Sequence, residues 1–237
     1  MSHESTTRLS LIIPCFNEAG NLSRLVERGK FALASHPGLE IIFVDNGSTD
    51  NTNNQLRDLA EGVDRMIIHD IDINRGYGFG IKSGLAIAKG ELLGWTHADL
   101  QTDPFDAIRA LELVPTRGSK VILKGTRTGR SFFDSLFTNG MSIFESILFR
   151  ASLWDINAQP TIFSRDLNEV LLSGPDDFSL DLFALVSAKR LEFQEIRFPV
   201  IFGPRFSGES KWNNSASARW KFIKRTLKFS VHLARKG

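Results

Sequence analysis

Short hydrophobic runs and stretches with helical spacing alternate along the first half of the chain. The hydrophobic runs are rich in β-branched residues and predict strands at 9–13, 40–44, 65–69, 91–95 and 120–123. The stretches between them predict helices at 19–35, 52–61, 76–88 and 104–114, the last with Asp103 as its cap and Pro104 as its first residue. This alternation favours an α/β fold with a mostly parallel sheet, right-handed crossovers and flanking helices.

The composition is that of one folded domain. Of the 237 residues, 42% are hydrophobic and 24% are charged, which excludes intrinsic disorder for most of the chain. The sequence contains no repeat, no low-complexity segment and no linker rich in Pro, Gly or Ser. Because no run approaches the ~18 apolar residues of a membrane span, we expect any membrane contact to be peripheral.

The cysteine content and the N-terminal segment indicate in which cellular compartment the protein is expected. Cys15 is the single cysteine, so an internal disulfide is excluded. The N-terminal segment MSHESTTRLS contains no apolar stretch suited to a signal peptide. We therefore expect a cytoplasmic protein in a reducing environment.

The net charge of +2 conceals an uneven distribution. The residues after Lys211 include seven Lys and Arg and no Asp or Glu. Without those seven, 22 basic residues stand against 27 acidic ones in the rest of the chain. The body of the protein is thus acidic and its tail basic, an asymmetry typical of a segment that binds an acidic surface.

Polar residues follow three of the predicted strands, and carboxylates are among them each time. Asn17 and Glu18 follow the first strand, Asp45 the second, and His97 and Asp99 the fourth. Ligands of parallel sheets bind at the carboxyl ends of the strands. One such loop would be ordinary turn chemistry, but three at the same edge favour a binding site.

At these residues the chain resembles family 2 glycosyltransferases, and most closely their polyprenyl-phosphate sugar transferase branch, typified by dolichyl-phosphate mannose synthase. The matching segments occur in the family's order. They are IIPCFNE at 12–18, VDNGSTD at 44–50, NRGYGFG at 74–80, ADLQTDP at 98–104 and GESK at 208–211. The resemblance implies the nucleotide-sugar-binding fold called GT-A, over residues 1–211, followed by a basic amphipathic tail at 212–237.

The resemblance also implies a set of donor-binding residues. Asp45 would contact the base of the nucleotide, and its carboxylate can accept hydrogen bonds from a base or a ribose. The remaining positions expected at the donor are Pro14, Asn17, Glu18, Gly47, Ser48, Gly76, Gly78 and Ala98. Two ordinary explanations remain: the loop of Asp45 as a solvated turn, and Glu18 as a favourable acidic residue at a helix start.

A divalent cation is expected at the fourth strand. A nucleotide diphosphate leaves with negative charge that Mg²⁺ or Mn²⁺ can neutralise, and such ions prefer oxygen ligands. Asp99 and Gln101 are two residues apart, so on an extended strand end they would point the same way. The resembled branch has Asp at the position of His97, which leaves three roles open for His97: Mn²⁺ ligand, sugar contact or bystander.

The acceptor side is indicated by a second set of residues. Arg127 lies in a turn that in the resembled branch meets the acceptor phosphate, and a guanidinium matches phosphate geometry; a surface arginine is the alternative. Arg205 and Lys211 resemble a basic lid over the diphosphate. Asp155 is the candidate general base, although an acceptor that is already an anion needs none. A further helix is expected from about Pro175, with Asp177 and Asp181 on it.

The tail predicts a basic amphipathic helix at 218–236. With residues turning by about 100° each, its basic side chains share one sector of roughly 120°, with apolar residues on both flanks. Such a helix suits an anionic membrane surface. Docking on the acidic body and nucleic-acid binding are the alternatives, and nucleic acid is disfavoured because no basic and aromatic groove recurs elsewhere.

Together these features predict an inverting, metal-assisted glycosyltransferase of polysaccharide or glycolipid biosynthesis. It would move a hexose from a nucleotide-diphosphate sugar to a polyprenyl phosphate or a lipid-linked glycan, on the inner face of the membrane. The alternative is a sugar-nucleotide-binding subunit that has lost catalysis through His97 and acts with a partner. A sugar-nucleotide pyrophosphorylase is disfavoured, because 14–17 is not the Gly-rich basic loop that such enzymes need.

Overall fold

The fold was determined as a computed structural model. It describes residues 7–128, 132–204 and 216–235, and within the last two ranges the side chains of 140–204 and 223–235. Arg205 and Lys211, the expected basic lid, lie outside the described residues.

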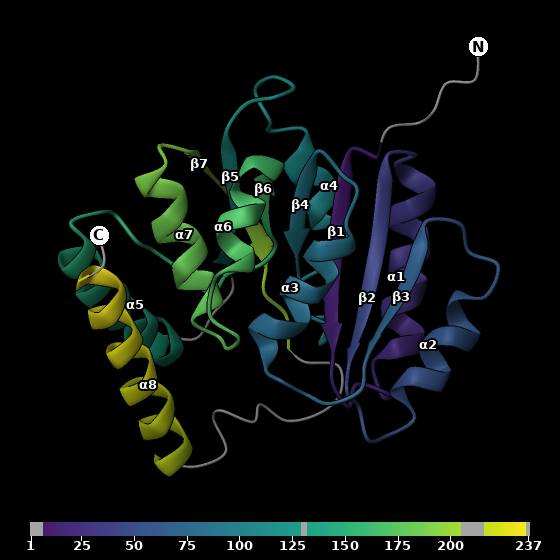
Figure 1. Cartoon of the computed structure of the whole chain (residues 1–237), viewed down its shortest axis with the longest axis horizontal. Coiled ribbons are helices and arrows are strands. Elements are labelled where there is room, and N and C mark those ends of the chain that lie inside the picture. The colour runs from purple at the N-terminus through teal and green to yellow at the C-terminus, as the bar shows by residue number, and fades with distance from the viewer. Residues whose placement is uncertain (1–6, 129–131, 205–215, 236–237) are drawn as a thin grey trace.

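A single sheet of seven strands forms the centre of the molecule, in the order β3-β2-β1-β4-β6-β5-β7 (Figure 1). The strands are β1 Leu9–Cys15, β2 Leu39–Asn46, β3 Met66–Ile71, β4 Leu92–Trp95, β5 Val121–Thr128, β6 Thr161–Ser164 and β7 Gln194–Ile201. The first four pair in parallel, as do β5 and β7. Only β6 runs antiparallel to its neighbours, so the mostly parallel sheet is confirmed.

Helices cover both faces of this sheet (Figure 1). They are α1 Leu22–Ser35, α2 Thr52–Ala60, α3 Tyr77–Ile87, α4 Asp106–Leu111, α5 Phe132–Phe149, α6 Asn168–Leu172, α7 Leu180–Arg190 and α8 Ala216–Arg235, with a short 3-10 turn, η1, at Arg165–Leu167. The first four correspond to the four helices predicted between strands. The tail helix is also present, as α8.

Three predicted helix starts are wrong, and the first of these helices begins at Leu22 rather than at residue 19. The fourth helix begins at Asp106, because Asp103 forms a turn ahead of it: its Oδ1 accepts from the Phe105 N–H at 2.9 Å. The helix expected from Pro175 begins instead at Leu180. There the Asp177 carboxylate accepts from the Ser179 N–H at 2.8 Å, which stabilises a turn before the helix. Short polar side chains that bond to nearby backbone favour such turns.

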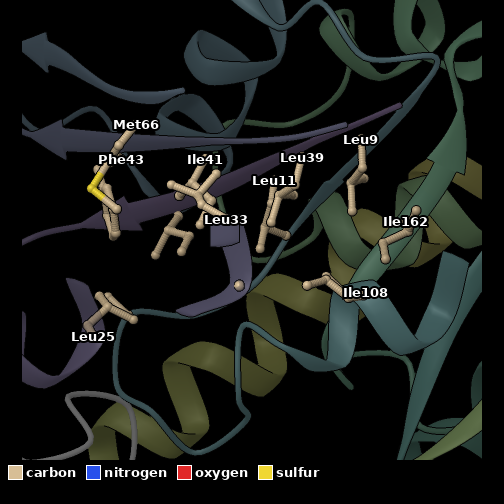
Figure 2. Packing of buried hydrophobic residues seen from close by; sticks show 14 of the residues in the cluster. Leu9, Leu11, Leu25, Leu33, Leu39, Ile41, Phe43, Met66, Ile108 and Ile162 are labelled. Atoms are coloured by element: carbon tan, nitrogen blue, oxygen red, sulfur yellow. The ribbon is translucent and has the colours of Figure 1, made fainter. Parts of the chain in front are cut away.

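Two hydrophobic layers hold the helices to the sheet. Successive strand residues point to opposite faces, so Leu9 and Leu11 of β1 join one layer while Ile12 joins the other. Figure 2 shows the first layer, where Leu25 of α1 and Ile41 of β2 gather with the β1 leucines. The second layer packs the other face of the sheet against α3 and α7.

The C-terminal helix is attached to the body on one side. In Figure 1, α8 lies beside α5. The Ser230 hydroxyl donates to the Glu145 carboxylate at 2.6 Å, and Leu233 belongs to the second hydrophobic layer. Arg190 of α7 also donates to the Leu233 carbonyl at 3.1 Å. None of the helices in the described ranges is long and apolar enough to cross a bilayer.

Candidate active site

The parallel strands β1, β2 and β4 end at one edge of the sheet, and the polar loops predicted from the sequence meet there. Cys15 pairs in register with Asp45, and Ile12 with Trp95. The three strand ends therefore lie side by side, toward the lower edge in Figure 1. The sequence prediction of three neighbouring loops is thus confirmed by the topology.

Asp45 is the centre of the first two loops. It is only 4% exposed. Its Oδ1 accepts from the Ser48 N–H at 3.2 Å and its Oδ2 from the Asn53 side chain at 2.9 Å. A carboxylate offers about four acceptor sites, so these bonds fix its orientation without exhausting its capacity for a ligand.

Asn17 and Gly47 join the loops to one another. The Asn17 N–H donates to the Ser48 hydroxyl at 3.0 Å, and the Asn17 Oδ1 accepts from the Thr49 N–H at 2.8 Å. Gly47 has a φ of +70°, and a Cβ there would lie 2.4 Å from the Asn74 nitrogen. Only glycine suits both conditions. The loops after β1, β2 and β3 therefore form one continuous surface.

Two carboxylates of this surface lie near the β1 thiol. Burial raises the pKa of Cys15 well above its usual value, and the charges of Glu18 and Asp45 raise it further. Glu18 is held by Asn21, whose side chain donates to its Oε2 at 2.5 Å, and the Glu18 N–H donates to Thr52 Oγ1 at 2.9 Å. The Cys15 thiol thus remains protonated.

The glycines at the start of α3 pack against another loop. A Cβ on Gly76, which has a φ of +116°, would lie 2.4 Å from the Asp176 carbonyl oxygen. A Cβ on Gly78 would lie 2.4 Å from the Pro175 carbonyl oxygen. This close packing accounts for both residues, and their contact with a donor stays a prediction.

The loop after β4 carries the expected metal residues, but not on an extended strand. The strand ends at Trp95, and Leu100 has a φ of +57°. The spacing argument that places Asp99 and Gln101 on one side is therefore wrong for this loop. Asp99, 5% exposed, instead accepts from the Gln101 N–H at 3.1 Å. Gln101 in turn donates through its side-chain Nε2 to the Gly203 carbonyl at 3.2 Å, and the main-chain carbonyl of Gln101 accepts from the Gly203 N–H at 2.9 Å.

The donor set fits an ion shared with a substrate rather than a closed metal cage. Within residues 7–128, 132–204 and 216–235, no three His, Cys, Asp or Glu side chains gather in a way that could hold a metal. Mg²⁺ is commonly bound by one or two carboxylates together with substrate phosphates. Asp99, with Gln101 Oε1 or His97 Nε2 nearby in sequence, suits this arrangement.

A buried polar network lies beside this loop, and the sequence gave little sign of it. Lys124 is fully buried; its Nζ donates to Thr161 Oγ1 at 2.7 Å and lies 3.6 Å from Asp181 Oδ1. Gln159 Nε2 donates to Asp181 Oδ1 at 2.8 Å and to the Tyr77 hydroxyl at 3.3 Å. Burial lowers the pKa of Lys124 to about 8, against the effect of Asp181. The available signal was one lysine directly after the apolar run 121–123.

Arg127 and Asp155, the predicted acceptor arginine and the candidate base, form one ion pair. Asp155 Oδ2 accepts from the Arg127 N–H at 2.8 Å, and its Oδ1 accepts from Arg127 Nε at 2.7 Å. The guanidinium also lies 5.3 Å from the centre of the Phe202 ring. Both carboxylate oxygens therefore face Arg127.

A cavity of about 430 Å³ opens beside this pair. Its lining combines an exposed aromatic ring with charged and hydroxyl groups from β5, β7, α7 and the loop after α5: Thr126, Ser152, Trp154, Asp155, Lys189, Glu195 and Arg197. Glu195 bridges Lys189 at 2.6 Å and Arg197 at 2.5 Å. The cavity is thus polar and balanced in charge.

The fold is similar to that of a solved glycosyltransferase. A mannosyltransferase from Pyrobaculum calidifontis, solved in complex with GDP-Man and Mn²⁺, superposes with a TM-score of 0.69. The match covers 100% of this chain and 67% of that one, at 18% sequence identity. This likeness establishes the GT-A fold and carries no residue assignment.

Two curated relatives share more of the sequence. The chain is 35% identical, over 132 residues, to a dodecaprenyl-phosphate galacturonate synthase of Rhizobium johnstonii, covering 54% of this chain and 38% of the relative. It is 30% identical, over 223 residues, to an undecaprenyl-phosphate 4-deoxy-4-formamido-L-arabinose transferase of Photorhabdus laumondii, covering 90% and 65%. The chain therefore spans less than two thirds of either relative.

The family model described as glycosyl transferase family 2 matches residues 10–150, which include the loops of Asp45 and Asp99 and the strand of Arg127. The chain belongs to glycosyl transferase family 2.

Proposed function

We propose that the protein transfers a hexose, with inversion, from a nucleotide-diphosphate sugar to a polyprenyl phosphate. The observation that carries the donor half is the pair of buried carboxylates, Asp45 and Asp99, on the loops that follow β2 and β4, on either side of β1 at one sheet edge. Asp45 would bind the base or ribose, and Asp99 would face the diphosphate. The relatives named for dodecaprenyl and undecaprenyl phosphate support the acceptor class.

A phosphate acceptor suits the Arg127–Asp155 pair better than a hydroxyl does. A hydroxyl needs a base to take its proton, and Asp155 is poorly placed for that because both its oxygens accept from Arg127. A phosphate needs no base and can take the place of the carboxylate on the guanidinium. We therefore assign acceptor binding to Arg127, with Asp155 as the group that orients the guanidinium before the acceptor binds.

The reaction then needs few participants. An acceptor phosphate oxygen attacks the anomeric carbon on the face opposite the diphosphate, the bond from that carbon to the diphosphate oxygen breaks, and the nucleoside diphosphate leaves with both electrons. A divalent cation at Asp99 and Gln101 would supply positive charge to the leaving group. Arg205 and Lys211 are proposed to add to that charge.

Membrane contact is proposed for the face formed by α5 and α8. On α5, Ile143 and Ile147 are 50% and 73% exposed, and Phe144 lies beside them. On α8, which packs against α5, the exposed basic residues include Lys224, Lys228 and Arg235. Apolar side chains next to basic ones suit the interface of an anionic bilayer.

The test is a transfer assay with Mn²⁺ or Mg²⁺, a panel of nucleotide sugars, and polyprenyl phosphate or a lipid-linked glycan as acceptor. Asp99→Asn should lower kcat by at least about a hundredfold, since a metal-assisted leaving group is worth several kcal/mol. Asp58→Asn, an exposed carboxylate on α2, is the matched control and should be near normal. A near-normal rate for Asp99→Asn would contradict the proposal. Binding of a nucleotide sugar without transfer to either acceptor would instead favour the non-catalytic subunit.

A further inference from the structure

Three aromatic rings from separate elements form a row beside the metal loop. Tyr77 begins α3, His97 lies in the loop after β4, and Phe178 precedes α7. The ring centres of Tyr77 and His97 are 5.5 Å apart, with an interplanar angle of 31°. Tyr77 and Phe178 stack with centres 4.5 Å apart and an angle of 12°. The His97 ring therefore has an aromatic support on the side of α3.

Tyr77 is in turn held at its hydroxyl by the buried network of Gln159, Asp181 and Lys124. The Tyr77 hydroxyl accepts from Gln159, which also donates to Asp181, and Asp181 faces the buried Lys124. Gln159 and Asp181 are each 1% exposed and Lys124 is 0% exposed. Breaking a buried pair of charges leaves one uncompensated, so these groups have little freedom to move. Tyr77 is thus held at its ring by Phe178 and at its hydroxyl by Gln159.

This row lies next to Asp99. His97 is two residues before Asp99 in the loop that follows β4, so the two side chains come from the same end of that strand. Burial raises the pKa of Tyr77, and the negative charges of Asp181 and Asp99 raise it further. In a nucleotide-diphosphate sugar the transferred sugar is bonded to the phosphate farthest from the nucleoside. A diphosphate at Asp99 would therefore bring the sugar next to the groups that flank Asp99 on the side of α3.

We propose that Tyr77 is a positioning residue that holds His97 against the donor sugar, so that His97 selects the sugar and does not bind the metal. The inference rests on the proposed function and deepens it. His97 and Tyr77 share a ring contact, which fixes the imidazole on the side of α3. An imidazole held in one orientation presents its N–H or lone pair to a sugar hydroxyl at a fixed angle, which can distinguish epimers.

The experiment compares Tyr77→Leu, Tyr77→Phe and His97→Ala with the wild type. Phe31→Leu is the matched control, because Phe31 also pairs with an aromatic ring, Phe105 at 5.4 Å, but lies 53% exposed on α1. Three quantities are measured for each protein: kcat/KM for the preferred donor and for its epimer on the same nucleotide, the Kd of the nucleoside diphosphate with Mn²⁺, and the Mn²⁺ concentration for half-maximal rate.

Tyr77→Leu should reduce the discrimination between the two epimers by roughly three- to tenfold, the worth of an aromatic pair. Its nucleoside diphosphate Kd and its Mn²⁺ requirement should stay within about twofold of the wild type, because those depend on Asp45 and Asp99. His97→Ala should give the same pattern, and the double variant should lose no more than either single one. Tyr77→Phe keeps the ring and should retain most of the discrimination. Phe31→Leu should leave all three quantities unchanged.

Two results would overturn the inference while leaving the proposed function intact. One is a His97→Ala protein whose Mn²⁺ requirement rises while its sugar discrimination persists, since His97 would then be a ligand. The other is a Tyr77→Leu protein that behaves like Phe31→Leu. A wild-type protein that binds no nucleotide sugar at all would overturn the proposed function first, and the inference with it.

Discussion

At the scale of single residues, the candidate site depends on carboxylates at strand ends that are oriented by donors from their own loops and from the helix that follows. Asp45 was predicted from its loop, and the structure adds Asn53 and Ser48 as the donors that orient it. The Lys124 and Asp181 pair was not predictable, because the two residues are far apart in the chain and meet only when β5 and α7 pack. Local patterns reveal turns and strand ends, whereas such pairs depend on tertiary structure.

Asp45→Asn should raise the donor KM by about ten- to a hundredfold, since a hydrogen bond to a charged group contributes roughly 1.5–3 kcal/mol. The fold should persist, because an amide oxygen can still accept from Ser48 or Asn53. Steady-state kinetics and thermal unfolding separate the two effects, with Asp58→Asn as control. An unchanged donor KM would show that the loop of Asp45 is a turn that does not bind the donor.

Lys124→Met should destabilise the protein by about 3–5 kcal/mol, because Asp181 would be left as a buried charge without its partner. The double variant Lys124→Met with Asp181→Leu should recover most of that loss. Urea denaturation of the wild type, both single variants and the double variant measures the coupling. Additive losses would show that the two charges do not compensate one another.

At the scale of elements, sequence periodicity located the strands and helices of the first half well and their ends less well. Regular repeats of apolar residues mark the middle of an element, but its first turn depends on side chains such as Asp103 and Asp177 that bond to nearby backbone. The helix α8 was predicted to lie on an anionic membrane surface, with docking on the acidic body as the main alternative. The structure adds its contact with α5, through a serine and a buried glutamate, Ser230 and Glu145.

This contact should make stability depend on pH. Burial raises the pKa of Glu145 from 4.5 to about 7, although the Ser230 hydrogen bond opposes the rise. The folded protein therefore keeps this proton at pH values where the unfolded chain has lost it. Folding takes up a proton between about pH 4.5 and 7, so stability falls as the pH rises through that window and then stays at the lower level.

Glu145→Gln removes the titrating group and should remove this part of the pH dependence. At pH 8 the variant should be more stable than the wild type, by at most about 3 kcal/mol, and near pH 4.5 the two should be similar. Thermal unfolding of both proteins at several pH values between 4.5 and 8 is the measurement. Parallel curves over that range would contradict the role of Glu145.

At the scale of the whole molecule, the sheet edge proposed for the donor is separate from the α5 and α8 face proposed for a membrane. The GT-A fold and the family follow from motifs in fixed order, so the sequence predicted both. The proposed membrane face needed the structure, because only the structure shows that α8 packs against α5 and that Ile143 and Ile147 of α5 are exposed.

Replacing Lys224, Lys228 and Arg235 together with Gln should weaken binding to anionic vesicles by up to about a hundredfold at low salt, since each basic residue near such a surface contributes about 1 kcal/mol. The matched control replaces Lys30, Lys89 and Lys120, exposed lysines elsewhere, and has the same net charge. Vesicle flotation at two salt concentrations measures the effect. Equal flotation of both triple variants would argue against this face. Substitution is preferable to deleting α8, whose Leu233 lies in the hydrophobic core.

The position of β7 at the end of the sheet bears on how copies of the chain behave at high concentration. The N–H groups of Gln194 and Phe202 point toward β5, bonding to Lys120 and Thr128. Alternate residues of a strand point their N–H groups in opposite directions, so Pro199 occupies an outward position and has no N–H to offer. Glu195 and Arg197 occupy the other outward positions of β7 and place charged residues along this edge. An incoming strand from a second molecule would find its ladder interrupted, and fibril growth through this edge is disfavoured.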